Sequence, residues 1–329
     1  MKFRNVILGI SFGTFVLIGC GGTTPVDGND LPTPTGTITQ DDTEVIQKEL
    51  VATKLKPEDM LAALGGGTTA LGGTKHLLRS IRSTKSILDT NDGFAGTFQC
   101  SISGSYTVTV TSGEAPAGSS GAQEGSVKYT EVYNDCSVNA HITMNGTNEY
   151  SLTWKVGSDN STWSFDYTGT SKNFIFKLDD THKFTMTSTS WKDSTTRDAN
   201  SYNNTFSYQY SGTLVNGSET TTFTNISVDE TDNNNWTDET HSMTWKISGA
   251  VKNDAFGGTI VITTPVAFAE NQDDTVGTTS CPHAGKIVVS GATGVVSTEV
   301  SSDHKITVKF NDTVVKEYEN CTAYDADNS

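Results

Sequence analysis

The sequence predicts a mainly β protein: a large antiparallel meander, either an open or nearly closed barrel or a sandwich, preceded by two short helices. From Phe94 onward apolar and polar residues alternate with period two, which is typical of strands with one buried face and one solvated face. Asn-Gly pairs and similar turn residues interrupt these runs at the spacing of hairpins. No alternation of strands with helices occurs, so a parallel sheet with a nucleotide site is not expected.

Residues 1–19 have the order of a secretory signal segment. Lys2 and Arg4 precede an apolar run from Val6 to Gly19. A run of this length is too short to span a bilayer comfortably. We therefore expect an export signal and not a membrane span.

The residues Leu17-Ile18-Gly19-Cys20 at the end of this run resemble the lipobox of bacterial lipoproteins. The resemblance covers residues 1–20 and implies that the Cys20 thiol is modified with diacylglycerol and that the chain is then cleaved before Cys20. The palmitate-like acyl chains would hold the mature protein in a membrane. Gly21 follows, where some enterobacterial lipoproteins carry the aspartate that retains them at the inner membrane. We therefore expect a lipid-anchored protein of the bacterial cell envelope, at the outer membrane, facing the periplasm or the cell surface.

Residues 20–43 are expected to form a lipidated flexible tether, because they contain almost no large apolar side chains. Residues 44–93 carry helical periodicity, which predicts two short helices within 44–64 and 75–88. The second would have an apolar stripe beside a basic face, so it could dock on the sheet or lie on an anionic membrane surface. We favour docking, because docking buries the stripe without a special lipid.

We assign residues 94–329 to an antiparallel β domain of roughly a dozen or more strands. Turns are expected at Asn145-Gly146 and Asn216-Gly217. The alternating runs include Tyr106-Val108-Val110, Tyr150-Leu152-Trp154, Trp163-Phe165-Tyr167, Phe174-Phe176-Leu178, Phe206-Tyr208-Tyr210 and Met243-Trp245-Ile247. A transmembrane barrel shows the same alternation, but the short runs and the polar face dense in Thr and Ser favour a sheet outside the membrane.

Four cysteines besides Cys20 predict two disulfides, because the signal directs the chain to an oxidising compartment. Four cysteines allow three connectivities, and spacing alone does not choose among them. Local similarity does: a glycine follows both Cys100 and Cys281 at the same offset, and a tyrosine precedes both Cys136 and Cys321 at the same offset. We therefore predict the disulfides Cys100–Cys136 and Cys281–Cys321.

The net charge of −16 argues against nucleic acid as a partner, because an acidic surface repels phosphate backbones. No serine nucleophile elbow, zinc-binding motif, P-loop or dinucleotide fingerprint occurs, and the six histidines are scattered singly. We therefore predict no catalytic residue and no cofactor, and we expect that the protein is not an enzyme.

The densest group of oxygen ligands lies in residues 229–239, where Asp229, Asp232, Asp238 and Glu239 are candidates to bind calcium. The segment lacks the Asp-x-Asp-x-Asp-Gly spacing of a helix-loop-helix calcium site. A solvated hairpin loop is therefore favoured, and no metal site is assigned.

Three functions of different classes remain open. The sequence favours a membrane-anchored envelope lipoprotein whose β domain is a non-catalytic binding or structural module of unknown ligand. The alternatives are a carrier of a lipid or other apolar ligand in a partly open sheet cavity, and an enzyme whose site only the fold assembles. The expected partners are the membrane, through Cys20, and a protein or an apolar ligand. With its Cys-x-x-x-Gly start and Tyr-x-x-Cys end, the β domain resembles uncharacterised bacterial lipoproteins only, which implies no activity.

Overall fold

The structure is a computed structural model, and it describes residues 31–47, 95–100, 102–113, 123–137, 143–157, 162–177, 180–216, 218–271, 275–276 and 279–328. Cys20 and its lipobox lie outside these residues, as does the predicted helical segment from residue 48 onward. The lipid anchor and the docking of the basic helix therefore stay predictions.

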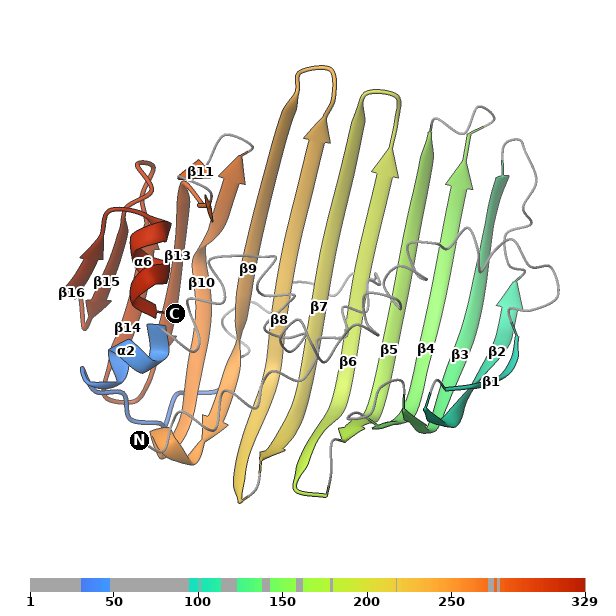
Figure 1. The fold of residues 1–329 in the computed structure, drawn as a ribbon, viewed down its shortest axis with the longest axis horizontal. Helices are drawn as coiled ribbons and strands as arrows, with labels where there is room; N and C mark the ends of the chain where they lie inside the picture. Colours follow the sequence, from blue (N-terminus) through green and yellow to red (C-terminus); the bar gives the residue numbers. More distant parts are fainter. Residues whose placement is uncertain are drawn as a thin grey trace.

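A single antiparallel sheet of 14 strands, arranged in the order of the sequence, makes up most of the structure (Figure 1). Its strands are β1 (Gly96–Gln99), β2 (Ser103–Gly113), β3 (Gln123–Ser137), β4 (Thr143–Val156), β5 (Trp163–Lys177), β6 (His182–Arg197), β7 (Ser201–Asn216), β8 (Glu219–Asn235), β9 (Thr240–Asn253), β10 (Gly258–Asn271), β13 (Ala284–Ser290), β14 (Val295–Val300), β15 (Ile306–Phe310) and β16 (Thr313–Tyr318). A separate hairpin pairs β11 (Thr275–Val276) with β12 (Thr279–Ser280). The predicted meander is confirmed, and it is open: β1 and β16 form its two edges.

The strands are longer than the alternating runs of the sequence. Strands β3 to β10 contain 14 to 17 residues each, and the two runs that begin at Trp163 and Phe174 are parts of one strand, β5. The turn predicted at Asn145-Gly146 is wrong, because both residues lie inside β4. There the register shifts after Asn145, and Gly146 has a φ of 132°, so this glycine supplies a bulge and not a hairpin turn.

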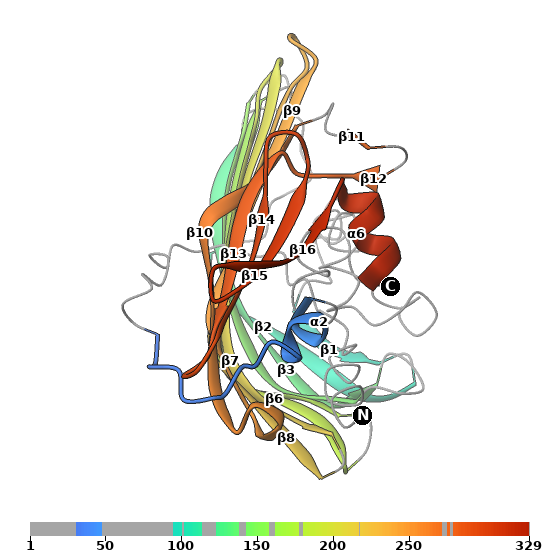
Figure 2. The ribbon, with the colours of Figure 1, turned by 90° about the vertical axis from the view of Figure 1, so that its left-hand side faces the viewer.

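The curved sheet carries the two described helices, α2 (Asp42–Ile46) and α6 (Cys321–Asn328), on one side, which we call its inner face (Figure 2). Ile46 and Tyr324 from these helices are fully buried in the largest apolar core, which they share with inner-face residues of β7 to β10 and β13 to β16. The sequence pattern did not predict α6. None of the described helices is long and apolar enough to cross a membrane.

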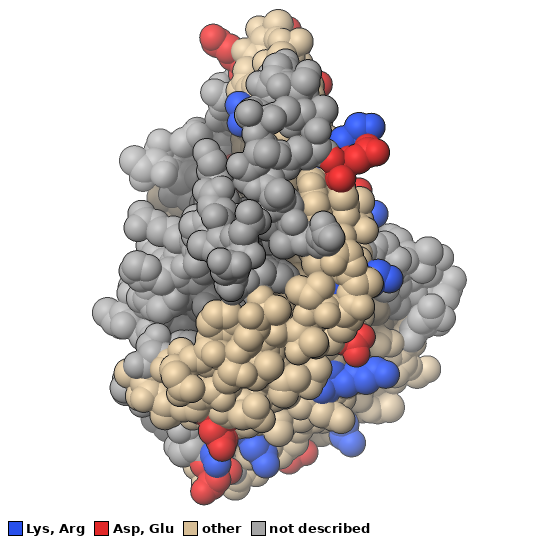
Figure 3. Space-filling model, turned by 90° about the vertical axis from the view of Figure 1, so that its right-hand side faces the viewer, with Lys and Arg blue, Asp and Glu red and all other residues tan. Residues whose placement is uncertain are grey.

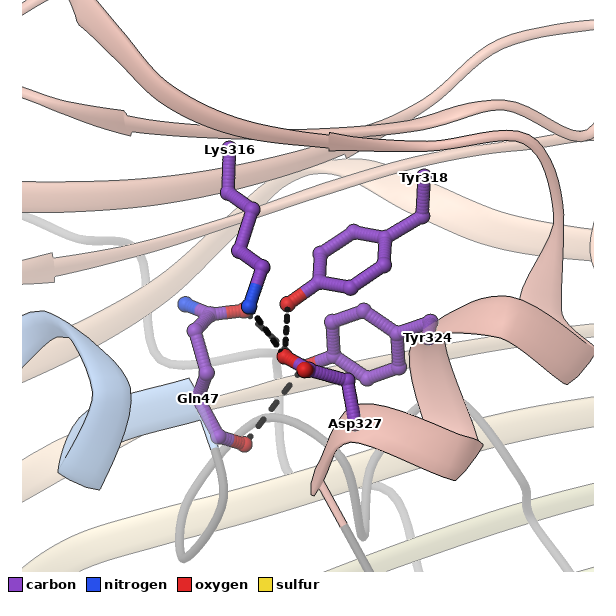
Figure 4. Close-up of polar contacts among 5 residues, drawn as sticks. All are labelled: Gln47, Lys316, Tyr318, Tyr324 and Asp327. Atoms are coloured by element: carbon purple, nitrogen blue, oxygen red, sulfur yellow. Dashed lines mark hydrogen bonds and ion pairs between the residues drawn. The ribbon is translucent and has the colours of Figure 1, made fainter.

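Gln47 joins the amino-terminal segment to the carboxy-terminal helix (Figure 4). Its Oε1 accepts hydrogen bonds from the hydroxyls of Thr298 (2.8 Å) and Tyr324 (2.9 Å). Beside these bonds, the Tyr318 hydroxyl donates to the Asp327 carboxylate at 2.9 Å (Figure 4). These side-chain bonds therefore hold α2, β14, β16 and α6 together.

Residues 35–38 also pack on the sheet. Two of their backbone N–H groups donate to the carbonyl oxygen of Thr259, at 2.9 and 2.8 Å, and Ile38 is only 1% exposed. Residues 35–38 therefore do not belong to the flexible tether that was expected over residues 20–43, because Ile38 gives them an apolar side chain to bury.

Both predicted disulfides are present. Cys100, directly after β1, is bonded to Cys136 of β3, and Cys281 is bonded to Cys321, the first residue of α6. The Cα atoms are 5.5 and 5.7 Å apart, within the ordinary range for a disulfide. The second bond attaches the carboxy-terminal helix to the region just before β13.

Large aromatic rings on the inner face lie flat over glycines of the neighbouring strands. The pairs are Trp154 over Gly125, Trp191 over Gly169 and Phe268 over Gly285. A Cβ atom built at Gly169 would lie 1.9 Å from Cζ2 of Trp191, far inside van der Waals contact. The rings can therefore occupy these positions only because the glycines have no side chain.

We expect Gly169→Ala to lower the free energy of unfolding by about 1–3 kcal/mol, because the added methyl group must displace the Trp191 ring. Thr170→Ala, at the exposed next position of the same strand, is the control and should change it by less than about 0.5 kcal/mol. Urea unfolding of the three proteins checks this. Equal midpoints for Gly169→Ala and Thr170→Ala would contradict the packing described.

Candidate functional site

A cluster of five tyrosines lies on the inner face of β2 to β5, at the end of the sheet away from α2 and α6 (Figure 1). This tyrosine cluster consists of Tyr106, Tyr129, Tyr133, Tyr150 and Tyr167. Alternation places them on one face, and the strand register pairs Tyr106 with Tyr133 and Tyr129 with Tyr150. The ring centroids of Tyr129 and Tyr150 are 4.7 Å apart, those of Tyr150 and Tyr167 are 5.7 Å apart, and both pairs are stacked.

The aromatic surface continues from the cluster into the main core. The Trp191 ring meets Tyr150 edge to face at 5.5 Å. Beyond it, Tyr208 and Tyr210 of β7 lie 5.4 Å apart, and Tyr210 lies 5.9 Å from Phe223 of the main core. The inner face of β2 to β8 is therefore a continuous surface of rings.

Glu131 lies in the middle of the tyrosine cluster. It occupies β3 between Tyr129 and Tyr133, so alternation turns its side chain to the same inner face. Its Oε2 atom accepts hydrogen bonds from the hydroxyls of Tyr133 (2.7 Å) and Tyr150 (3.0 Å), whereas no described bond ends on its Oε1 atom. None of the described Lys, Arg or His residues forms an ion pair with it.

A row of buried polar residues crosses the sheet beside Glu131. Asn148 is its direct partner on β4, followed by Ser171 on β5 and Thr189 on β6. The hydroxyls of Ser171 and Thr189 bond to each other at 2.8 Å, and Nδ2 of Asn148 donates to the Tyr150 hydroxyl at 3.1 Å. Asn148 is 2% exposed, yet its Oδ1 atom has no hydrogen-bond partner among the described residues.

Trp191 carries another buried polar atom without a partner in the described part of the chain, its Nε1. The side chain is 2% exposed. The described residues hold two more such atoms, Oγ1 of Thr43 and Nε2 of Gln47, both in the segment that contains α2. An unpaired buried donor or acceptor costs about 1–3 kcal/mol, so native proteins rarely leave one without a reason. Two such atoms, one acceptor and one donor, therefore border the same Tyr150 ring.

Burial also determines which groups carry charge. It raises the pKa of Tyr133, Tyr150 and Tyr167 well above the ordinary tyrosine value, and the nearby Glu131 carboxylate raises it further. At neutral pH these hydroxyls therefore keep their protons. Burial raises the pKa of Glu131 as well, although the hydrogen bonds from two tyrosines act in the opposite direction.

Other carboxylates also lie on this inner face, and Asp232 there pairs with His241. Asp193 of β6 accepts hydrogen bonds from Thr195 and Asn204, and burial raises its pKa. On β8, burial and the neighbouring Asp232 raise the pKa of Glu230. In contrast, the register places every described lysine of β3 to β7 on the opposite face.

The outer face has a different character. On β3 to β7 its residues are mostly Thr and Ser, interspersed with charges of both signs. Figure 3, which views the β1 end of the sheet, shows acidic and basic side chains of the described part mixed and not gathered into a patch of one sign. Such a surface is typical of a solvated sheet face.

The calcium candidates do not converge. Asp229 and Asp232 lie three residues apart on β8, so they point to opposite faces, and Asp238 and Glu239 lie in the turn before β9. Asp232 instead pairs with His241 at 2.8 Å. No group of three or more His, Cys, Asp or Glu in the described part of the chain is arranged to hold a metal.

The tyrosine cluster was not predicted from the sequence. One signal was available: in the stretch Tyr129-Thr130-Glu131-Val132-Tyr133 of β3, a carboxylate occupies the apolar phase of the strand, between two aromatic residues. A charged side chain at such a position points to the buried face, where it needs a hydrogen-bonding or ionic partner, so it is unusual in a strand. Alternation alone does not show that Tyr150 and Asn148 of the next strand would meet it, because this depends on register.

Comparison of the chain with protein-family models, curated proteins and solved structures gives no match.

We expect Glu131→Gln to raise the free energy of unfolding at pH 7. Because burial raises the pKa of Glu131 in the folded protein, ionising this carboxyl is less favourable there than in the unfolded chain. The free energy of unfolding of the wild type therefore falls as the pH rises from 4.5, the ordinary pKa of a glutamate, to the pKa of Glu131 in the folded protein. The advantage of the variant should therefore shrink below pH 4.5, where both states bind the proton. Urea unfolding at several pH values measures it.

Glu149→Gln is the matched control for this experiment, because Glu149 lies on the exposed face of β4. It should change the free energy of unfolding by less than about 0.5 kcal/mol throughout the range. A stability difference between Glu131→Gln and wild type that does not vary with pH would contradict the raised pKa.

Proposed function

We propose that the protein is a lipoprotein of the bacterial cell envelope, anchored through Cys20, whose β domain is a non-catalytic binding module. Its binding surface is the inner face of β2 to β7, centred on the tyrosine cluster. Its ligand has an apolar body and at least one polar group.

The observation that carries this proposal is the combination of a continuous aromatic surface with unpaired buried polar atoms. Stacked rings bind apolar or ring-shaped groups without a directional bond. The Oδ1 atom of Asn148 and the Nε1 atom of Trp191 offer an acceptor and a donor within that surface. Apolar packing alone does not require these two atoms beside the rings, whereas a ligand site uses a few polar groups to orient the molecule that it binds.

The tyrosine hydroxyls can take part in binding as hydrogen-bond donors. Their raised pKa values keep them protonated at neutral pH, so they serve as hydrogen-bond donors and not as bases or nucleophiles. The inward carboxylates disfavour anionic ligands, including nucleic acid and acidic lipid head groups.

A second candidate function, carriage of the apolar ligand between membranes, is favoured by the open sheet. The edges β1 and β16 are not paired with each other, so the inner face is not enclosed by a full circle of strands. Transfer of a fluorescent lipid between vesicles, faster with the protein than without it, distinguishes a carrier from a stationary binder.

We expect the full-length chain, extracted from its own membranes in mild detergent, to retain a small apolar molecule in native mass spectrometry. Leu152→Asp should remove this mass, because it places a charge on the aromatic face. Thr153→Asp, on the exposed face of the same strand, should retain it.

Circular dichroism of both variants verifies that they are folded. If Leu152→Asp is not, displacement of the molecule from wild type by a long-chain alcohol provides the same test. A wild-type protein without added mass, and with no affinity for long-chain alcohols, would refute the binding module.

For the anchor, we expect the intact mass of the membrane-extracted protein to equal residues 20–329 plus acyl chains, minus four hydrogens for two disulfides. Cys20→Ser should lack the acyl mass and leave the membrane fraction. Cys100→Ser with Cys136→Ser is the control, since it removes a disulfide and should keep the lipid. Acylation that persists in Cys20→Ser would show that the anchor is elsewhere.

A further inference from the structure

The polar atoms beside the tyrosine cluster include two acceptors that lack donors. Glu131 and Asn148 are direct partners across the β3–β4 ladder, so their side chains start from adjacent positions on the inner face. Both described hydrogen bonds to Glu131 end on Oε2, which leaves Oε1 available. The Oδ1 atom of Asn148 is buried and unpaired within the described residues.

The same place lacks positive charge. The described groups around the Glu131 carboxyl are tyrosines, and no described cation forms an ion pair with it. Glu131 is half-buried, and a carboxylate partly removed from water without a cation is less stable than one in water; a bound cation would offset that loss.

The rings around Glu131 also favour a cation. Tyr106 and Tyr133 stack at 5.6 Å, and Tyr150 and Tyr129 stack beside them. Faces of aromatic rings attract organic cations, and carboxylates surrounded by rings are suited to ammonium groups.

We propose that Glu131 and Asn148 bind the primary ammonium group of an amphipathic amine, whose apolar chain lies along the rings of β4 to β7. This rests on the proposed function, because the aromatic face is taken to hold the apolar part. An ammonium has three N–H donors, so it can donate to Oε1 of Glu131 and to Oδ1 of Asn148 together. A hydroxyl has a single donor and no charge, and a trimethylammonium has charge but no donor.

The test measures the affinity of the full-length chain, in a fixed concentration of non-ionic detergent, for five probes: octylamine, ethylamine, octanol, octyltrimethylammonium and octanoate. Octylamine should bind at least about tenfold more tightly than each of the others, because only it combines the tail, the charge and the donors. Octanoate should bind most weakly, since its charge meets the inward carboxylates.

Glu131→Gln should reduce the preference for octylamine over octanol to about twofold or less, because the ionic partner is lost. Glu149→Gln removes a carboxylate one residue from Asn148 but on the exposed face, so it should leave the preference unchanged. If Glu131→Gln does not fold, the probe series on wild type still decides the question.

The outcomes separate this proposal from the proposed function. Equal affinities for octylamine and octanol would overturn the ammonium site and leave the apolar binding module standing. Equal affinities for octylamine and octyltrimethylammonium would overturn the role of the two acceptors. Equal affinities for octylamine and ethylamine would overturn the role of the aromatic face, and the absence of binding by every probe would overturn both proposals.

Discussion

The register of the antiparallel ladder is the constraint on which the rest of this structure depends. In a strand, every second side chain points to the same face, so a slip of one residue would exchange the two faces completely. Bulges adjust the ladder in several places, for example after Asn145 of β4, and the inner phase is kept on both sides of them. All three apolar cores consequently lie on one face of the sheet and share residues such as Phe184 and Tyr106.

The inner face that buries the aromatic rings also carries carboxylates. Glu131, Asp193 and Glu230 all stand in the inner phase, and burial raises the pKa of each. A sheet stabilised only by apolar packing would have no use for these residues, because desolvated carboxylates weaken a core. The presence of Glu131 beside two unpaired polar atoms, on the part of the sheet farthest from the helices, is what distinguishes the tyrosine cluster from an ordinary hydrophobic layer.

Much of the fold could be predicted from the sequence, because alternation is a local property. Period-two runs such as Phe206-Tyr208-Tyr210 indicated the strands, and the echo around Cys100 and Cys281 indicated the disulfides. Strand lengths could not be read in the same way. Gly146 looks like a turn residue in the sequence, but its place in a bulge depends on the neighbouring strands.

The tyrosine cluster could not be predicted from the sequence, because it too depends on how neighbouring strands pair. Glu131 meets Tyr150 through pairing between strands, and local sequence does not contain that information. The calcium candidates illustrate the reverse case: Asp229 and Asp232 are neighbours in the sequence and are separated by the thickness of the sheet. Helix α6 was missed because its eight residues show little apolar periodicity and its position depends on a disulfide.

The hydrogen bonds of Gln47 to Thr298 and Tyr324 have a consequence for the order in which the chain folds. Each hairpin of a meander pairs segments that are close in sequence, so its strands can assemble one after another as the chain emerges. The segment from Thr35 to Gln47 is the exception, because its partners Thr259, Thr298 and Tyr324 lie 224, 251 and 277 residues further on. The segment from Thr35 to Gln47 can therefore dock only after the carboxy-terminal strands and α6 have formed, and this docking completes the fold.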